Sequence, residues 1–255
     1  ERALSLLDEM RVVDVAPEQI SFSSTISACV NGGRWERALS VLEDMRAARL
    51  MPDVISFNAA ISAYGKSRRW ERALSLLDEM RVVGIAPDQI SFSSAISACV
   101  NGGRWERTLA VLDDMRASRI TPNVISFTSA ISGCAKRGKW DCALSLLHKM
   151  RLARVAPDVI TFGATMWACE KSGQWQRALL LLQDTMPAAG IAPDVISINA
   201  AISACEKSLK WSRALSLLDV MRAKGIAPNV ISFNAAMSAC AKTGEWKRTL
   251  SLLDE

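Results

Sequence analysis

Apolar residues recur along this chain at helical spacing, in two alternating kinds of segment. In the first kind, for example residues 54–67, they fall three or four positions apart: Phe57, Ala60, Ile61 and Tyr64. In the second, for example residues 70–82, they form one stripe among charged residues: Ala73, Leu74, Leu76, Leu77 and Met80. Such intervals place side chains on one face of an α-helix. Glycine follows most first segments and a GIAPD-like connector follows the second, so we predict two helices joined into a hairpin.

The hairpin recurs at a nearly constant interval. The connector proline and the tryptophan that opens the second segment both step by 35 residues, with one step of 36. A period of this size is typical of solenoids, whose units bury their apolar faces by stacking on their neighbours. The sequence therefore predicts an all-α fold, an α-solenoid of stacked helix-turn-helix hairpins that winds into a right-handed superhelix.

We expect one array over residues 1–255. Its parts are a half repeat at 1–18, repeats at 19–53, 54–88, 89–123, 124–158, 159–194 and 195–229, and a partial repeat at 230–255. The repeat at 159–194 carries one extra residue and Pro187, which predicts a bulge or an early helix end there and not a domain boundary. Because the chain begins and ends inside repeats, we expect it to be part of a longer protein.

Three residue series are predicted to pack inside the array. A phenylalanine recurs in the first segment, with Ile198 in its place once: Phe22, Phe57, Phe92, Phe127, Phe162 and Phe233. A tryptophan opens each second segment, where helix packing is favoured over exposed base stacking: Trp35, Trp70, Trp105, Trp140, Trp175, Trp211 and Trp246. Six cysteines share one repeat position, which indicates small buried apolar residues in a reducing compartment: Cys29, Cys99, Cys134, Cys169, Cys205 and Cys240.

Composition narrows the possible functions. Lys and Arg number 31 against 26 Asp and Glu, so the net charge of +5 suits an anionic partner without requiring one. No apolar run is long enough to cross a membrane, so we expect no membrane insertion. His148 is the single histidine and is predicted to be a surface residue. Without an acidic cluster, a paired metal ligand or a Gly-rich phosphate loop, we expect no enzyme activity, no metal and no cofactor.

The repeat resembles the P-type pentatricopeptide repeat. The resemblance rests on the 35-residue period, the run VISFNAAISA, the Lys and Gly that follow it, and the runs WERALSLLDEM and GIAPD. It covers all 255 residues and recurs in every unit. The tryptophan at the start of the second helix departs from the family's usual smaller aliphatic residue, which concerns packing more than binding. The resemblance implies single-stranded RNA binding, one base per repeat, in a mitochondrion or plastid. Any targeting peptide would precede this stretch.

The resemblance also implies specific roles for residues. Each base is read by the fifth residue of the first helix and the last residue of the repeat: Ser23 with Asp53, Asn58 with Asp88, Ser93 with Asn123, Thr128 with Asp158, Gly163 with Asp194, Asn199 with Asn229, and Asn234 in the last partial repeat. An aliphatic series would sandwich the bases: Ile20, Ile55, Ile90, Ile125, Ile160, Ile196 and Ile231. A basic series would face phosphates: Lys66, Lys136, Lys171, Lys207 and Lys242.

These pairs imply the RNA sequence G-U-A-G-N-C/U. A carboxylate only accepts hydrogen bonds and therefore suits the imino N–H of guanine or uracil, whereas an amide can also donate and suits adenine or cytosine. In the family a small hydroxyl at the fifth position goes with purines and asparagine with pyrimidines. Gly163 offers no side chain, so its repeat is expected not to discriminate.

Other interpretations of the same residues stay open at this point. Asp53 and its equivalents stand just before a helix, where Asp is a preferred N-cap. The Ile series would also suit packing between repeats, and the Lys series would suit solvated charges at helix C-termini. The alternative function, ranked second, is an architectural, protein- or ribosomal-RNA-binding scaffold subunit of a large organellar complex. In that case the pairs do not dictate the sequence that is bound.

Overall fold

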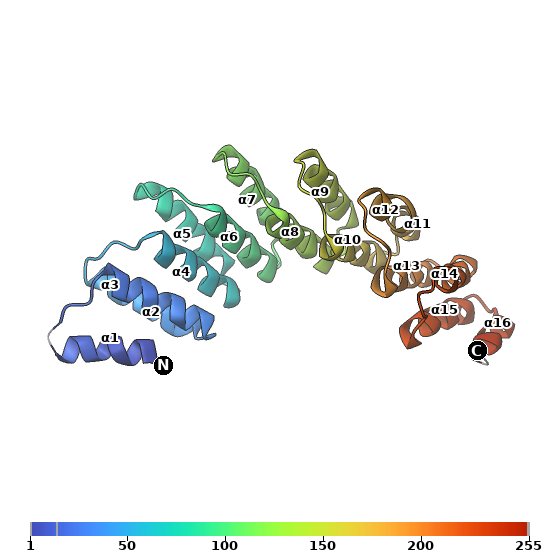
Figure 1. Cartoon of the computed structure of the whole chain (residues 1–255), viewed down its shortest axis with the longest axis horizontal. Helices are drawn as coiled ribbons and strands as arrows, with labels where there is room; N and C mark the ends of the chain where they lie inside the picture. The colour runs from blue at the N-terminus through green and yellow to red at the C-terminus, as the bar shows by residue number, and fades with distance from the viewer. Residues whose placement is uncertain (1, 14, 254–255) are drawn as a thin grey trace. The chain divides into compact units, whose positions relative to one another are not determined.

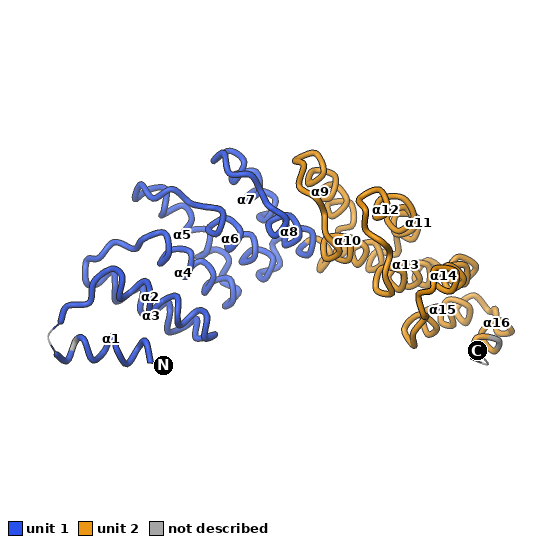
Figure 2. The backbone as a smooth tube through the Cα atoms, viewed as in Figure 1, with its two compact units in different colours: residues 1–133 blue, residues 134–255 orange. Residues whose placement is uncertain are grey.

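The computed structural model describes residues 2–13 and 15–253, which form helices joined by short turns (Figure 1). No strand occurs in these ranges, so the all-α prediction is confirmed. The chain divides into two compact units, Glu1–Gly133 and Cys134–Glu255 (Figure 2). The division falls within one helix, α8 (Val124–Lys136). The expected single array over residues 1–255 stays a prediction.

The helices follow the predicted hairpins. Before α8, unit 1 contains α1 (Arg2–Val12), α2 (Gln19–Asn31), α3 (Trp35–Ala47), α4 (Val54–Lys66), α5 (Trp70–Val82), α6 (Gln89–Asn101) and α7 (Trp105–Ala117). After α8, unit 2 contains α9 (Trp140–Leu152), α10 (Val159–Lys171), α11 (Trp175–Leu180), η1 (Leu181–Thr185), α12 (Met186–Ala188), α13 (Val195–Lys207), α14 (Trp211–Ala223), α15 (Val230–Lys242) and α16 (Trp246–Leu253). None of the described helices is long and apolar enough to cross a membrane.

Local signals in the sequence explain where first helices begin and end. The Asp53 carboxylate accepts a hydrogen bond of 2.8 Å from the Ser56 N–H, which satisfies one free N–H at the start of α4. Glycine residues such as Gly103 follow the first helices in the left-handed region, at φ 71°. In the second repeat Arg68 takes this conformation, at φ 59°, so the turn forms there at the cost of backbone strain.

Within each unit, first helices stack on first helices. In unit 1, α4 packs between α2 and α6, and in unit 2, α13 packs between α10 and α15. The second helices α3, α5, α7, α11, α14 and α16 pack against the first helix of their own hairpin, and α3, α5, α9, α11 and α14 pack against the next first helix. Each unit is therefore a stretch of stacked hairpins with a continuous core, as the period predicts.

The predicted phenylalanine core is confirmed with one correction. The side chains from Phe22 to Phe162 in that series, and Ile198, are at most 2% exposed. Phe233 is half-buried instead. It lies in α15, and among the described residues no further first helix packs on that helix.

The tryptophans that open second helices are half-buried, as expected for a packing role, except the last. Trp70 is half-buried and lies against Gly102, where an added Cβ would meet the indole at 2.4 Å. The Arg104 guanidinium lies 5.4 Å from the centroid of the same ring. Glycine at 102 therefore leaves room for the tryptophan of the preceding repeat. Trp246 is 62% exposed, so the packing prediction is wrong for this residue.

The six equivalent cysteines are buried, as predicted, and those described form no disulfide. Burial raises the pKa of Cys99 and Cys205 to about 11 and that of Cys169 to about 12, although a nearby arginine acts in the opposite direction in each case. These thiols are therefore protonated at neutral pH and serve as small apolar residues.

The extra residue of the fifth repeat is absorbed by a π-helical turn. Where other repeats have one second helix, this repeat has α11, then η1, then α12. A π-helical turn accommodates one additional residue without moving the rest of the helix around its axis. The Thr185 hydroxyl donates to the Leu180 carbonyl, five residues earlier, at 3.3 Å. The expected local distortion is thus confirmed, and Asp194 still caps α13 through the Ser197 N–H.

Candidate functional site

Three of the predicted pairs of fifth and last residues meet directly, at the start of the following repeat. In the first pair, Ser23 Oγ lies 3.1 Å from Asp53 Oδ1 and 2.8 Å from Ser56 Oγ. The Asp53 side chain also caps α4, so the two interpretations of this residue are both realised. The cap fixes the carboxylate beside the hydroxyl of the preceding repeat.

The second pair has the same frame with a longer side chain. Asn58 Nδ2 donates to Asp88 Oδ1 at 3.1 Å, and Asn58 Oδ1 accepts from Ser91 Oγ. Asp88 Oδ1 also accepts from the Ser91 N–H at 2.8 Å. The amide of Asn58 is therefore held at both ends, and its orientation is determined by these contacts.

The remaining pairs differ from one another in their contacts. Asn199 Nδ2 donates to Asn229 Oδ1 at 3.1 Å. Ser93 lies 3.0 Å from the Ser126 hydroxyl, which in turn contacts Asn123. Two predictions gain no side-chain pair, because Gly163 has no side chain to place beside Asp194 and Asn234 is exposed. Thr128 and Asp158 belong to different units, and their pairing stays a prediction.

A residue that the sequence analysis missed connects the pairs. The third residue of every first helix after α2 is a buried hydroxyl residue that contacts the cap before it: Ser56, Ser91, Ser126, Thr161, Ser197 and Ser232. In four repeats it also reaches the fifth residue of the preceding repeat, as Ser232 Oγ does with Asn199 Oδ1 at 2.6 Å. The sequence signal that could have revealed this residue is the serine or threonine at the third position of every first helix.

Capping leaves one atom of each last residue available. Oδ1 of Asp53, Asp88, Asn123 and Asn229 accepts the bond that caps the helix. The other atom, Oδ2 of Asp53 or Nδ2 of Asn123 and Asn229, has no hydrogen-bond partner among the described residues. Because the cap requires an acceptor, asparagine must present its NH2 donor and aspartate its second acceptor. This difference is the chemistry that the predicted base choice needs.

Asp88 is held in its charged form. Burial by itself would raise the pKa of its carboxyl, but hydrogen bonds from the N–H and hydroxyl of Ser91, from Asn58 Nδ2 and from the Ile90 N–H outweigh burial and lower the pKa below its ordinary value. The group is therefore acceptor-only at neutral pH.

Replacing Asp88 with asparagine tests this charge. A carboxyl whose pKa is lower in the folded state stabilises that state fully above its unfolded pKa, and the effect is lost as pH falls through the folded pKa. Asp88→Asn keeps a capping oxygen, so we expect a loss of about 0.3–1 kcal/mol at neutral pH. The loss should begin to shrink as pH falls past the unfolded value of about 3.9 and should vanish only below the lower pKa of the folded state. Urea unfolding at several pH values measures it, and a loss that is equal at every pH would contradict the assignment.

The Ile series is exposed, so packing between repeats does not explain it. Exposed fractions run from 59% to 75% across Ile20, Ile55, Ile90, Ile125, Ile160, Ile196 and Ile231. In unit 1, Ile90 and Ile125 border a hollow of about 470 Å3. The same hollow is lined by the pair Ser93 and Asn123 and by Lys66. Its size is that of a small-molecule site, and its lining combines apolar and polar side chains.

The lysines predicted to face phosphates lie late in the first helices and connect neighbouring repeats. Lys66 Nζ donates to the Val30 carbonyl at 2.8 Å, and Lys171 Nζ to the Lys136 carbonyl at 2.6 Å. These carbonyls are at the C-terminal ends of the preceding first helices, where a positive charge is favourable. Lys136 itself is exposed.

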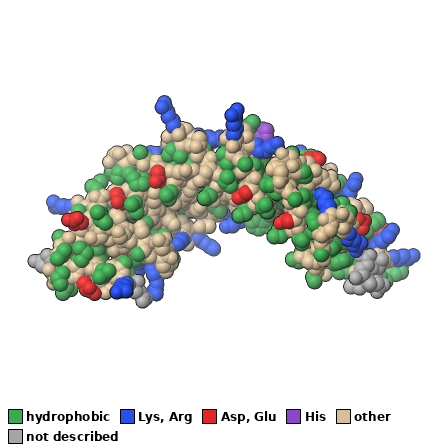
Figure 3. Space-filling model, viewed as in Figure 1, with side chains coloured by type: hydrophobic (Ala, Val, Ile, Leu, Met, Phe, Trp, Pro, Cys, Tyr) green, Lys and Arg blue, Asp and Glu red, His purple; other side chains and the backbone are tan. Residues whose placement is uncertain are grey.

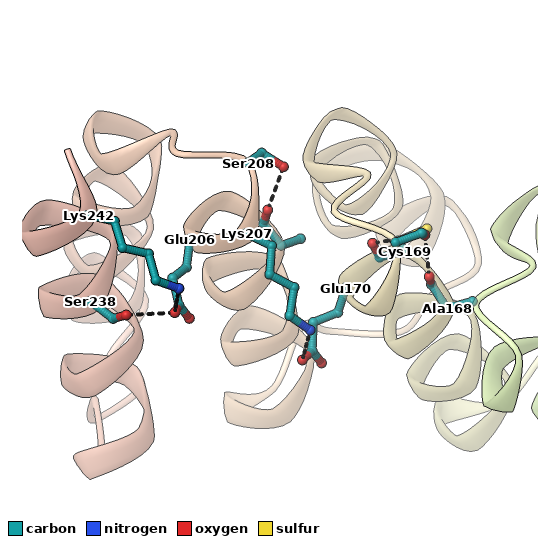
Figure 4. A network of polar contacts seen from close by, with 10 residues as sticks. Ala168, Cys169, Glu170, Glu206, Lys207, Ser208, Ser238 and Lys242 are labelled. Carbon is teal, nitrogen blue, oxygen red and sulfur yellow. Dashed lines mark hydrogen bonds and ion pairs between the residues drawn. The ribbon is translucent and has the colours of Figure 1, made fainter.

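In the last repeats the lysines pair with glutamates (Figure 4). Lys207 Nζ lies 3.2 Å from Glu170 Oε1, and Lys242 Nζ lies 2.8 Å from Glu206 Oε1. Burial would raise the pKa of Glu206, but hydrogen bonds from Lys242 and Ser238 and the nearby lysine charges lower it overall. All these pairs are partly exposed, so each adds little stability by itself. Phosphate contact by these lysines stays a prediction.

Family models match most of the chain. The model described as "Pentatricopeptide repeat domain" matches residues 5–67, 110–172 and 181–243, "PPR repeat family" matches residues 52–101, and "PPR repeat" matches residues 90–120. The chain belongs to the pentatricopeptide repeat family. The resemblance inferred from the repeat sequence is thereby confirmed. Among curated proteins, no significant match is found.

Solved pentatricopeptide repeat structures share the fold. The crystal structure of PPR10 from maize is 28% identical, with a TM-score of 0.75, over 98% of this chain and 36% of that chain. PPR10 in complex with an 18-nt psaJ RNA element is 20% identical, with a TM-score of 0.55, over 93% and 40%. The PPR domain of Arabidopsis thaliana protein-only RNase P 1, in complex with tRNA, is 17% identical, with a TM-score of 0.57, over 65% and 87%. The α-solenoid class is thus confirmed, and the chain spans about a third of the length of maize PPR10.

Proposed function

We propose that this pentatricopeptide repeat chain binds single-stranded RNA along its first helices, one base per repeat. The observation that carries the proposal is the hollow in unit 1, which is lined by Ile90 and Ile125 and by the pair Ser93 and Asn123. Exposed apolar side chains suit the faces of a base, and the polar side chains beside them suit its edge.

The capping geometry supports a choice between bases. Aspartate offers an acceptor and asparagine a donor beside the fifth residue, so the two cannot satisfy the same ring nitrogen. In the family, the RNA runs 5′ to 3′ as the chain runs from its N- to its C-terminus. With that orientation, the implied RNA is G-U-A-G-N-C/U. No catalytic role is proposed, since the described residues contain no group of three or more His, Cys, Asp or Glu that could hold a metal. We place the function in an organelle, in RNA processing, stability or translation.

A scaffold role in a large organellar complex is the second candidate. It is favoured by the lysines, because Lys66, Lys171, Lys207 and Lys242 already bond to neighbouring repeats. Acidic and basic side chains are also interspersed on the face drawn in Figure 3. In that case the groove would hold a protein, or ribosomal RNA recognised by shape, and base identity would not matter.

Binding to short RNAs separates the two functions. We expect the purified chain to bind an RNA containing GUAGNC about tenfold or more tightly than a shuffled RNA of equal composition, since about 1.4 kcal/mol of base-specific contact suffices. Fluorescence anisotropy at two salt concentrations measures this, and affinity for both RNAs should fall as salt rises. Equal affinity for the ordered and shuffled RNAs, or no binding, would reject sequence-selective recognition.

A further inference from the structure

We propose that Trp167 is a stacking platform for the RNA base at the fifth repeat. The inference rests on the proposed function and deepens it at one repeat. That repeat would hold its nucleotide by stacking and not by reading the base edge. It would then add affinity at the one position where the pair of reading residues is incomplete.

The position of Trp167 in its repeat corresponds to residues that line the hollow in unit 1. It is the ninth residue of the first helix α10, and every other copy has serine there: Ser27, Ser62, Ser97, Ser132, Ser203 and Ser238. In unit 1, Ser62 and Ser97 line the hollow that also contains the Ser93 and Asn123 pair. By repeat equivalence, an indole at the ninth position of α10 extends over the corresponding base site.

Trp167 does not fill a gap in the core. The tryptophans that open second helices pack between hairpins, as Trp70 does, whereas Trp167 is 40% exposed. Serine at the same position serves all other repeats, so stacking of the helices does not require an aromatic ring there. A large aromatic surface left in water is instead available to a partner.

Gly163 leaves space beside the ring. It lies four residues before Trp167, and residues at that spacing are neighbours on one helix face. A Cβ built on Gly163 would meet no atom within 4 Å, so packing does not demand glycine there. Ile160, seven residues before Trp167 and 69% exposed, lies on the same stripe. The fifth repeat thus has an open base site with an aliphatic residue at one end and an indole at the other.

Lysine orients the indole and supplies positive charge. Lys171 Nζ lies 5.5 Å from the ring centroid, over its face, and also donates to the Lys136 carbonyl at 2.6 Å. The ring is therefore held by a cation that is itself anchored, while 40% of the side chain stays exposed. The neighbouring acidic group, Glu170, is paired with Lys207 at 3.2 Å, which offsets its repulsion of a phosphate.

Stacking explains both an affinity gain and a lack of base choice. Base–aromatic stacking contributes about 1–3 kcal/mol per base and tolerates any base, since every base has a π-face. We expect Trp167→Ser to weaken binding about tenfold to each of the four RNAs that differ only at the fifth base of GUAGNC. An RNA with an abasic fifth position should bind the wild type weakly and should be almost insensitive to the substitution.

A spectroscopic readout reports stacking directly. With 2-aminopurine as the fifth base, the wild type should quench its fluorescence, and Trp167→Ser should not. With 2-aminopurine as the fourth base, both proteins should give the same signal. Because serine is the residue in every other repeat, the variant should fold, and far-UV circular dichroism verifies this.

Leu152→Ser is the matched control. Leu152 ends the second helix α9 and is 70% exposed, so its replacement also removes an exposed apolar side chain, on the other kind of helix. Its affinity should equal that of the wild type. The inference is overturned if Trp167→Ser binds GUAGNC as tightly as the wild type, or loses as much affinity for the abasic RNA. If the wild type still prefers the ordered RNA over the shuffled RNA, the proposed function stands and only the role of Trp167 is rejected. If the wild type shows no such preference, the proposed function and the role of Trp167 are both rejected.

Discussion

Phe92→Ala is expected to lower the free energy of unfolding by about 3–5 kcal/mol. Phe92 is 0% exposed, and α6, on which it lies, packs against α4, α5 and α7. Alanine would leave a cavity between three helices, which close-packed helices fill only partly. The Arg81 guanidinium, 5.7 Å from the ring centroid, would also lose its aromatic partner. Urea unfolding followed by far-UV circular dichroism measures the loss.

Ile90→Ala in the same helix is the control. Ile90 is 62% exposed, so removing its side chain should change stability by no more than about 0.5 kcal/mol. In RNA binding we expect the opposite order. Ile90→Ala should weaken binding more than Phe92→Ala, because Ile90 borders the proposed base site and Phe92 does not. Similar destabilisation by both would mean that α6 is not oriented as described.

Asn58→Ser is expected to move the preference at the second base from uracil toward guanine. In the wild type, the Asn58 amide fills the space between Asp88 and Ser91, to which it is hydrogen-bonded. Serine would reproduce the first pair, where the shorter Ser23 side chain lies beside Asp53 and Ser56. The shorter side chain leaves room for a purine, and Asp88 still offers an acceptor to an imino N–H.

The expected change in the guanine-to-uracil affinity ratio is about 5- to 150-fold, which corresponds to about 1–3 kcal/mol, because a mismatched edge leaves a polar group unpaired. Anisotropy titration with four RNAs that differ only at the second base measures it. Preference at the first base, assigned to Ser23 and Asp53, should stay unchanged in the variant and serves as its internal control. An unaltered second-base preference would refute the role assigned to Asn58.

Much of the fold was predictable because it depends on local signals repeated many times. Helix starts follow from residues such as Asp53, and turns from residues such as Gly103. The buried phenylalanines and cysteines follow from helical periodicity. Exceptions occur where neighbours differ, as for Phe233 and Trp246, whose exposure depends on what packs beyond them and not on their own repeat.

The sequence by itself determined the hairpin, its repetition, the core positions and which residues could pair. Only the tertiary structure decided that the Ile series is exposed, that Ser91 and its equivalents connect the pairs, and that lysines such as Lys66 bond to the preceding repeat. These contacts join residues about one repeat apart in sequence. They depend on the rotation and spacing between stacked helices, which periodicity within one helix does not specify.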